Sequence, residues 1–103
     1  MVTCMSVDPG ICGMKARIIV EKRDVSVNVN IESKCSDVKA FSSNLKSLSI
    51  NEVLKPLSEN RIYREAAKFL RHPSCPIPCA VLKAIEVELG LALKKDVHLT
   101  FCS

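Results

Sequence analysis

The sequence predicts an α+β fold in which a three-stranded antiparallel sheet packs against three to four helices. Residues 14–22 and 25–32 alternate apolar and polar side chains, which is typical of two strands with one buried face. Between residues 36 and 90, apolar side chains recur at helical spacing. Residues 97–101 alternate again and predict the third strand. Because helices and strands are separated along the chain, the class is α+β.

The first two strands form a hairpin with one apolar face. Arg23 and Asp24 make a two-residue connection between them, which favours antiparallel pairing. The apolar positions are Ala16, Ile18, Val20, Val25, Val27, Val29 and Ile31. The polar residues Ser26, Asn28, Asn30 and Glu32 alternate with the last four of these. One face of the hairpin is therefore expected to lie on the core.

The first helix is predicted over residues 36–48, so Cys35 lies at its start. Its apolar face consists of Val38, Phe41, Leu45 and Leu48. Ser49 and Glu52 have the spacing of a capping box, which indicates that a second helix begins there. Pro56 ends this short helix, because proline cannot continue the helical hydrogen bonding.

Two further helices follow. Ser58 or Asn60 can cap the third, whose apolar stripe contains Ile62, Ala66, Phe69 and Leu70. Pro78 is well placed as the first residue of the last helix, and Gly90 is expected to end it. Its apolar side carries Val81, Ile85 and Leu89. Cys79 then lies in the first turn of this helix.

The length of 103 residues predicts a single domain over residues 1–103, since domains commonly contain roughly 100 to 150 residues. With 48% hydrophobic side chains, a chain of this size forms a core without disulfides. The six cysteines are therefore the unusual feature of the composition.

Charge and hydropathy exclude several classes of function. The first ten residues contain no Lys or Arg, unlike a signal peptide, so we expect a cytoplasmic protein. No apolar run reaches the roughly 18 to 20 residues of a membrane-spanning helix. The net charge is +4, but the Lys and Arg residues are scattered along the chain, which does not favour nucleic-acid binding. No phosphate-binding loop, Ser-His-Asp set or His-Glu-x-x-His motif occurs, so a conventional hydrolase or nucleotide enzyme is not predicted.

Four cysteines lie at the ends of predicted elements, where side chains can project from a rigid scaffold. They are Cys12 before the first strand, Cys35 before a helix, and Cys75 and Cys79 around a proline-rich turn. Helix N-termini stabilise thiolates, and thiolates bind zinc, copper(I) and iron–sulfur clusters. His72 lies three residues before Cys75 and either joins the same site or caps a helix.

The alternative is that the cysteines are small packing residues, as many cysteines are. We expect this role for Cys4 and Cys102, which lie near the chain ends. Cys75 and Cys79 are separated by three residues, which differs from the C-x-x-C spacing of common zinc sites. His98 lies on the polar side of the last predicted strand, so we expect it at the surface and not in the candidate site.

In the order of these residues, the chain resembles the iron–sulfur cluster scaffolds of the NifU and IscU type. Cys12 and the glycine after it open a strand, and the hairpin ends at Cys35. Residues 48–54 are similar to the linker helix of that family, and His72 and Cys75 precede the final helix. The chain also resembles short prokaryotic proteins without an assigned function, through Pro-Gly-Ile-Cys-Gly and Ala-Leu-Lys-Lys-Asp-Val.

The scaffold resemblance covers residues 9–90 and implies a SufE/NifU-like fold. It also implies that Cys12, Cys35 and Cys75 bind an iron–sulfur cluster or zinc. Cys79 or His72 is the candidate fourth ligand. The partners implied are a sulfur-donor protein or a cluster-acceptor protein, and the oligomeric state is left open.

The chain departs from the scaffold family at four places. His72 is separated from Cys75 by two residues, whereas the two are adjacent in the family. Met14 stands where the family has an Asp that is tied to cluster release. Residues 71–74 replace its chaperone-recognition loop, so chaperone delivery is not implied. Only eleven residues precede Cys12, so we expect no counterpart of the family's first strand. Residues 97–101 are expected to take that place in the sheet.

Two other functions are consistent with the sequence. SufE-type sulfur acceptors share the fold of the scaffolds, so a thiol-based sulfur carrier or redox protein is one alternative. Its reactive thiol would be Cys79 or Cys12, and a second cysteine would resolve the intermediate. The other alternative is a small interaction module whose cysteines only pack against the core.

Overall fold

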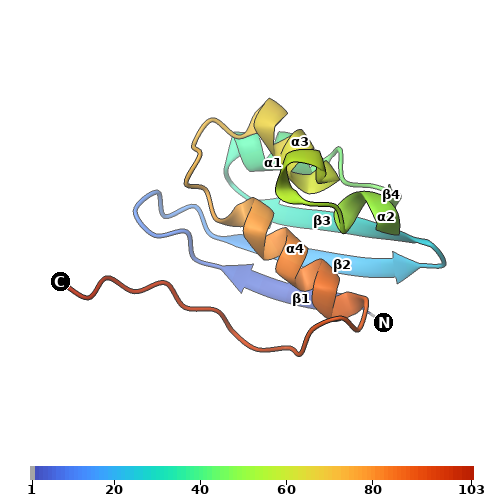
Figure 1. Ribbon diagram of the computed structural model, residues 1–103. Helices are drawn as coiled ribbons and strands as arrows, with labels where there is room; N and C mark the ends of the chain where they lie inside the picture. Colours follow the sequence, from blue (N-terminus) through green and yellow to red (C-terminus); the bar gives the residue numbers. More distant parts are fainter. Residues whose placement is uncertain (1) are drawn as a thin grey trace.

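The computed structural model describes residues 2–103, which form an α+β structure with one four-stranded antiparallel sheet (Figure 1). The strands are β1 (Val2–Val7), β2 (Ala16–Arg23), β3 (Ser26–Ser33) and β4 (Leu48–Ser49), and they lie in that order across the sheet. The predicted class is therefore confirmed, whereas the predicted number of strands is wrong.

The predicted hairpin is confirmed. Ala16 pairs with Ser33 at one end of β2 and β3, and Arg23 pairs with Ser26 at the other. The connection is shifted by one residue, because Asp24 and Val25 form the turn. Asp24 has a φ of 53°, a left-handed conformation that Asp tolerates better than most residues. The alternating valines and isoleucines of β2 and β3 face the core.

The strand next to this hairpin comes from the start of the chain, which corrects two expectations. β1 pairs with β2 from Val2 opposite Glu21 to Val7 opposite Ala16, so a strand does precede Cys12. Residues 97–101 form no strand, and the side chains of Leu99 and Phe101 are 90% and 97% exposed. Apolar and polar side chains alternate in residues 97–101 and, less clearly, in residues 2–7. A local antiparallel pairing across a short loop requires less loop-closure entropy than one from the far end of the chain.

The helices are α1 (Ser36–Ser42), α2 (Ile50–Val53), α3 (Arg61–Phe69) and α4 (Ile77–Glu88), with a 3₁₀-helix η1 (Leu57–Glu59) before α3. The helix predicted over residues 36–48 ends early, at Ser42. The chain then runs beside β3, where the Leu45 carbonyl accepts a hydrogen bond from the Val29 N–H at 2.9 Å. Leu45 and Leu48 are still buried, but they reach the core from extended backbone.

The predicted helix ends are largely confirmed. Ser49 and Glu52 form the capping box of α2. Asn60 caps α3, because its side-chain oxygen accepts a hydrogen bond from the Ile62 N–H at 2.9 Å. Pro78 is the second residue of α4, one position later than predicted. Gly90 follows α4 with a φ of 75°, the left-handed conformation typical of a residue that ends a helix.

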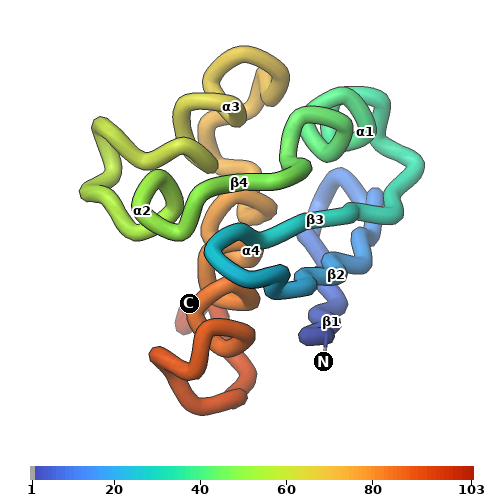
Figure 2. Tube along the Cα trace, turned by 90° about the vertical axis from the view of Figure 1, so that its right-hand side faces the viewer, coloured from blue at the N-terminus to red at the C-terminus, as the bar shows by residue number. Residues whose placement is uncertain are grey.

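The helices cover one side of the sheet, as Figures 1 and 2 show, and α4 packs on β1 and β2. Glu88 links the end of α4 to both strands by hydrogen bonds. Its carboxylate accepts hydrogen bonds from the Thr3 hydroxyl at 2.6 Å and from the Lys22 N–H at 3.1 Å.

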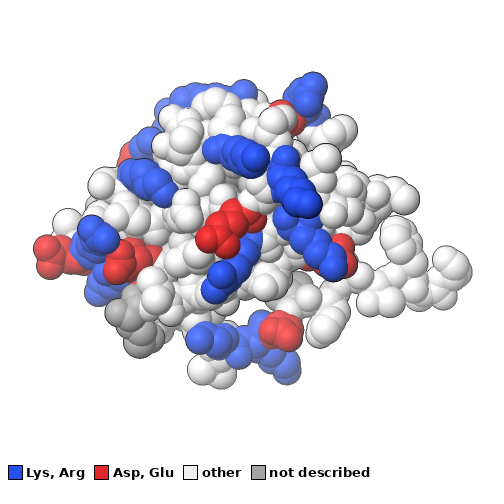
Figure 3. Space-filling view, turned by 180° about the vertical axis from the view of Figure 1, so that it is seen from behind, with Lys and Arg blue, Asp and Glu red and all other residues white. Residues whose placement is uncertain are grey.

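Seen from behind, Lys and Arg side chains are spread over the surface with Asp and Glu between them (Figure 3). In the described part of the chain, no helix has the length and apolar character needed to span a membrane.

Candidate functional site

The candidate site lies at the end of the sheet where Val7, Ala16 and Ser33 stand opposite one another. The loop of residues 8–15 joins β1 to β2 at this end, and α1 begins here after β3. Figure 1 shows the loop of residues 70–76, which leads into α4, at the same end of the molecule. Three segments that are distant in sequence thus bring Cys12, Cys35 and Cys75 to one region.

Cys12 is exposed on a loop that is held by local hydrogen bonds. The Gly13 N–H donates to the Gly10 carbonyl at 2.9 Å, and the Gly10 N–H donates to the Asp8 carboxylate at 3.1 Å. Both glycines have positive φ, 93° and 67°. Residues with a β-carbon rarely adopt this conformation, so the glycines explain the tight turn that presents Cys12 to solvent.

Cys35 is the N-cap residue of α1 and is half-buried. Its N–H donates to the Ser33 hydroxyl at 3.1 Å, and its carbonyl accepts from the Lys39 N–H at 3.0 Å. Its side chain makes no capping hydrogen bond. The backbone of Cys35 is therefore fixed while its sulfur is available for another interaction.

Cys75 is half-buried beside the core, and its N–H donates to the His72 carbonyl at 3.1 Å. Burial raises the pKa of the Cys75 thiol above its ordinary value, and a hydrogen bond from the Ile77 backbone opposes this shift. The negative charges of Cys35, Cys12 and Asp37 raise the pKa of Cys75 further. Cys12 and Cys35 are thus close enough to Cys75 to act on its thiol.

An ion pair connects two of the segments that form the site. The Arg71 guanidinium donates to the Asp37 carboxylate at 3.0 Å. This hydrogen bond lowers the pKa of Asp37, and the charge of His72 adds to the effect. The same pair raises the pKa of Arg71. Sequence reasoning missed both residues, although Asp37 is two positions from Cys35 and Arg71 is adjacent to His72.

The other cysteines lie elsewhere. Cys79 is exposed in the first turn of α4, and its charge raises the pKa of Tyr63 on α3, after the larger effect of burial. Cys4 is exposed on β1, where the Arg17 guanidinium donates to its sulfur at 3.2 Å. Cys102 is exposed near the end of the chain. Cys4 and Cys102 therefore do not pack in the core, contrary to the packing role expected for them.

The described residues 2–103 contain no group of three or more His, Cys, Asp or Glu side chains arranged to hold a metal ion. Cys12, Cys35 and Cys75 therefore share a region without adopting ligand geometry in this conformation.

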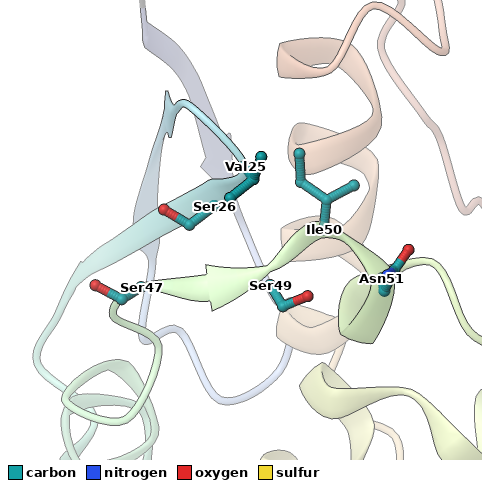
Figure 4. Close-up of a pocket in the computed structure, with 6 residues that line it drawn as sticks. All are labelled: Val25, Ser26, Ser47, Ser49, Ile50 and Asn51. Carbon is teal, nitrogen blue, oxygen red and sulfur yellow. The ribbon is translucent and has the colours of Figure 1, made fainter.

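Two shallow hollows lie at the surface. One, of about 600 Å³, adjoins the site and is lined by Gly13, Met14, Lys15, Glu32, Ser33 and Lys34. The other, of about 470 Å³, lies by the hairpin turn (Figure 4). It is lined by Val25, Ser26, Ser47, Ser49, Ile50 and Asn51. The second hollow is lined by no thiol or ionisable side chain. The first is lined by Lys15, Glu32 and Lys34 and adjoins the loop that carries Cys12.

Comparison with known proteins gives the family of the chain. No curated protein and no solved structure matches it. A family model does match, over residues 3–101, which include nearly all of β1, the three cysteines of the candidate site and nearly all of the C-terminal segment. The chain therefore belongs to DUF6951, a family of unknown function.

Proposed function

We propose that this protein binds a soft metal ion or an iron–sulfur cluster through the thiolates of Cys12, Cys35 and Cys75. The observation that carries the proposal is that three separate segments bring these cysteines to the same end of the sheet, where Cys35 and Cys12 both act on the thiol of Cys75. Three thiols from three separate segments are a donor set that zinc and iron–sulfur clusters favour. The resemblance to cluster scaffolds, which rests on the same cysteines, supports this function.

A bound cation would offset the negative charges that act on Cys75. Ionised Cys35 and Cys12 oppose the ionisation of Cys75, and the Asp37 carboxylate adds to this effect. A bound cation reverses this effect, because metal ions stabilise the deprotonated form of a ligand thiol. The bound cation would therefore remove the part of the Cys75 pKa shift that comes from neighbouring negative charges.

Ligand geometry requires a movement, and the Cys12 loop is the segment that can provide it. Cys12 is exposed and the loop is held by short-range hydrogen bonds, whereas Cys35 and Cys75 pack against the core. Local segments with few buried contacts rearrange at the lowest free-energy cost. We infer that Cys12 moves toward Cys35 and Cys75 when metal binds.

His72 is favoured over Cys79 as the fourth ligand. The charge of His72 acts on Asp37, which also acts on Cys75, so His72 lies beside the site. The charge of Cys79 acts on Tyr63 instead. A cluster bound in this way would require a protein that donates sulfur or one that accepts the cluster.

A thiol-based sulfur carrier is the second candidate, and the exposure of Cys12 on a protruding loop favours it. A nucleophilic thiol must be accessible and ionised. The raised pKa of Cys75 disfavours that residue as the nucleophile, so Cys12 or Cys79 would carry the sulfur.

Anaerobic purification followed by elemental analysis separates these functions. Metal binding predicts stoichiometric zinc or iron in the wild-type protein and its loss when Cys12, Cys35 and Cys75 are replaced by serine. Cys4→Ser with Cys102→Ser is the matched control and should retain the metal. A wild-type protein without metal in which Cys12 alone is alkylated rapidly would support the sulfur carrier instead.

A further inference from the structure

The C-terminal segment, residues 91–103, leaves the end of α4 without secondary structure and exposes large apolar side chains. These are Leu91, Leu93, Val97, Leu99 and Phe101. Val97, Leu99 and Phe101 alternate with His98, Thr100 and Cys102, which is the pattern of a strand with one apolar face. A single chain thus leaves a strand-forming segment in solvent.

The free edge of β1 is the surface that fits this segment. β1 pairs with β2 on one side, and on its other side it has no strand partner among residues 2–103. Proteins protect such edges with charged residues or proline, and Val2–Val7 contains neither. The unpaired N–H and C=O groups of β1 are therefore a template for another strand.

On the helix side, this edge carries two apolar side chains, Met5 and Val7, beside Thr3, whose hydroxyl is bound to Glu88. Met5 and Val7 pack against the core and are only partly buried, and so are Leu82 of α4 and Leu89 just after it. An added strand with three apolar side chains on that face would cover this margin. Residues 97–103 contain no Lys, Arg, Asp or Glu, and neither does β1, so neither strand brings such a side chain to the pair.

The segment does not occupy the edge of its own chain. Figure 1 shows it extended beneath β1, whereas Figure 2 shows it on the helix side of the sheet and not in the plane of the strands. The family match extends to residue 101, so the segment belongs to the common unit of the family. A second copy offers the same free edge and the same free segment.

We propose that two copies exchange these segments, so that residues 97–101 of each add a strand to the β1 edge of the other. Such a contact is two-fold symmetric, and every donated strand finds an equivalent edge. Backbone pairing supplies affinity, and the apolar side chains of Val97, Leu99 and Phe101 fix which face turns toward α4. The dimer is independent of what the cysteines bind.

Light scattering and sedimentation of the full chain under reducing conditions test this proposal. The wild-type protein should have twice the 11.3 kDa mass of the chain. Leu99→Asp with Phe101→Asp should weaken association at least about 100-fold, because burial of two apolar side chains per segment is lost. Thr100→Asp with His98→Asp is the matched control, since it adds the same charges to the opposite face and should leave the dimer intact.

Hydrogen exchange gives a second measurement that does not depend on a variant. Amides of residues 97–101 should be protected in the wild-type dimer and should exchange freely in Leu99→Asp/Phe101→Asp, whose circular dichroism should show a folded domain. A wild-type monomer at all concentrations, with these amides free or protected, would overturn the proposal. A dimer that persists in Leu99→Asp/Phe101→Asp would also overturn it.

Discussion

Four effects raise the pKa of the Cys75 thiol, namely burial and the negative charges of Cys35, Cys12 and Asp37. Asp37 is one of those groups and lies outside the proposed ligand set. Its effect on Cys75 can therefore be measured without removing a ligand.

Replacing Asp37 by Asn should lower the pKa of Cys75, because a negative charge that raises that pKa is removed. More thiolate is then present at neutral pH, so Cys75 should react faster with iodoacetamide, as followed by mass spectrometry in metal-free protein. Asp96→Asn, in the exposed C-terminal segment, should leave the rate unchanged. An unchanged or slower reaction in Asp37→Asn would show that Asp37 does not act on this thiol.

Glu52 gives a pH-dependent contribution to stability at the start of α2. Its pKa is lowered chiefly by the hydrogen bond from the Ser49 N–H, and Arg61 adds to the shift. Because the folded-state pKa lies below the ordinary value of 4.5, the stabilisation is present above that pH. It is lost as pH falls through the folded-state pKa.

Glu52→Gln should therefore be less stable than the wild type at pH 7, by no more than about 1 kcal/mol because the carboxylate is partly exposed. The difference in free energy of unfolding, measured with urea, should disappear in acid. Glu59→Gln, in η1 and outside the capping box, should show no comparable difference at pH 7. A difference for Glu52→Gln that persists in acid would exclude the ionised capping box as its source.

Which residues belong to the site could be predicted only in part. Cys12, Cys35 and Cys75 could be chosen because each stands at an element end, a property of local sequence. Asp37 and Arg71 could not, because they are 34 positions apart and only folding brings them together. The distances between the three sulfur atoms also depend on the conformation of the Cys12 loop. The positions of the cysteines in the sequence do not specify that conformation.

At the scale of elements, Glu88 is the polar contact that holds α4 on the sheet. It is buried, and its two hydrogen bonds reach β1 through Thr3 and β2 through Lys22. A helix that joins two strands in this way fixes their relative position. The cost of breaking the contact should therefore exceed that of an exposed substitution on the same helix.

Thr3→Val should destabilise the fold by about 1–3 kcal/mol, because it leaves one oxygen of the buried Glu88 carboxylate without its donor. Urea denaturation of Thr3→Val, Glu88→Ala and the double variant should give a coupling energy above about 0.5 kcal/mol. The exposed Glu86→Ala is the control on α4 and should change stability by less than about 0.5 kcal/mol. Additive effects of Thr3→Val and Glu88→Ala would mean that the two side chains do not interact.

Elements specified by local sequence could be predicted, and those chosen by distant contacts could not. The hairpin, the Ser49 capping box and the Asn60 cap depend on residues a few positions apart. The length of α1 depends on β3, whose edge pairs with the backbone at Leu45. The strand beside β2 comes from residues 2–7 and not from residues 97–101, because Thr3 at a buried position makes the alternation of β1 less clear than that of residues 97–101.

At the scale of the whole molecule, the core lies between the sheet and the helices, and the C-terminal segment lies outside it. Ile85 is fully buried in that core, whereas the side chain of Leu93 is 91% exposed. The two residues therefore contribute very differently to the free energy of unfolding, although both are large and apolar.

Ile85→Ala should lower the free energy of unfolding by about 2–5 kcal/mol, a large share of the roughly 5–15 kcal/mol of a typical domain. Leu93→Ala should change it by less than about 0.5 kcal/mol. Both values come from urea denaturation at a single low protein concentration. Equal losses for the two variants would mean that the C-terminal segment packs on the core.

The proposed function depends on whether one metal ion binds all three thiols. Cobalt(II) titration of the anaerobic, metal-free protein tests this directly, because thiolate ligands give cobalt an intense charge-transfer absorption. We predict saturation at one cobalt per chain, with a large loss of absorption in each of Cys12→Ser, Cys35→Ser and Cys75→Ser and none in Cys4→Ser or Cys102→Ser. Absence of the absorption in the wild-type protein, or its persistence in Cys12→Ser, Cys35→Ser and Cys75→Ser, would contradict the three-thiol site.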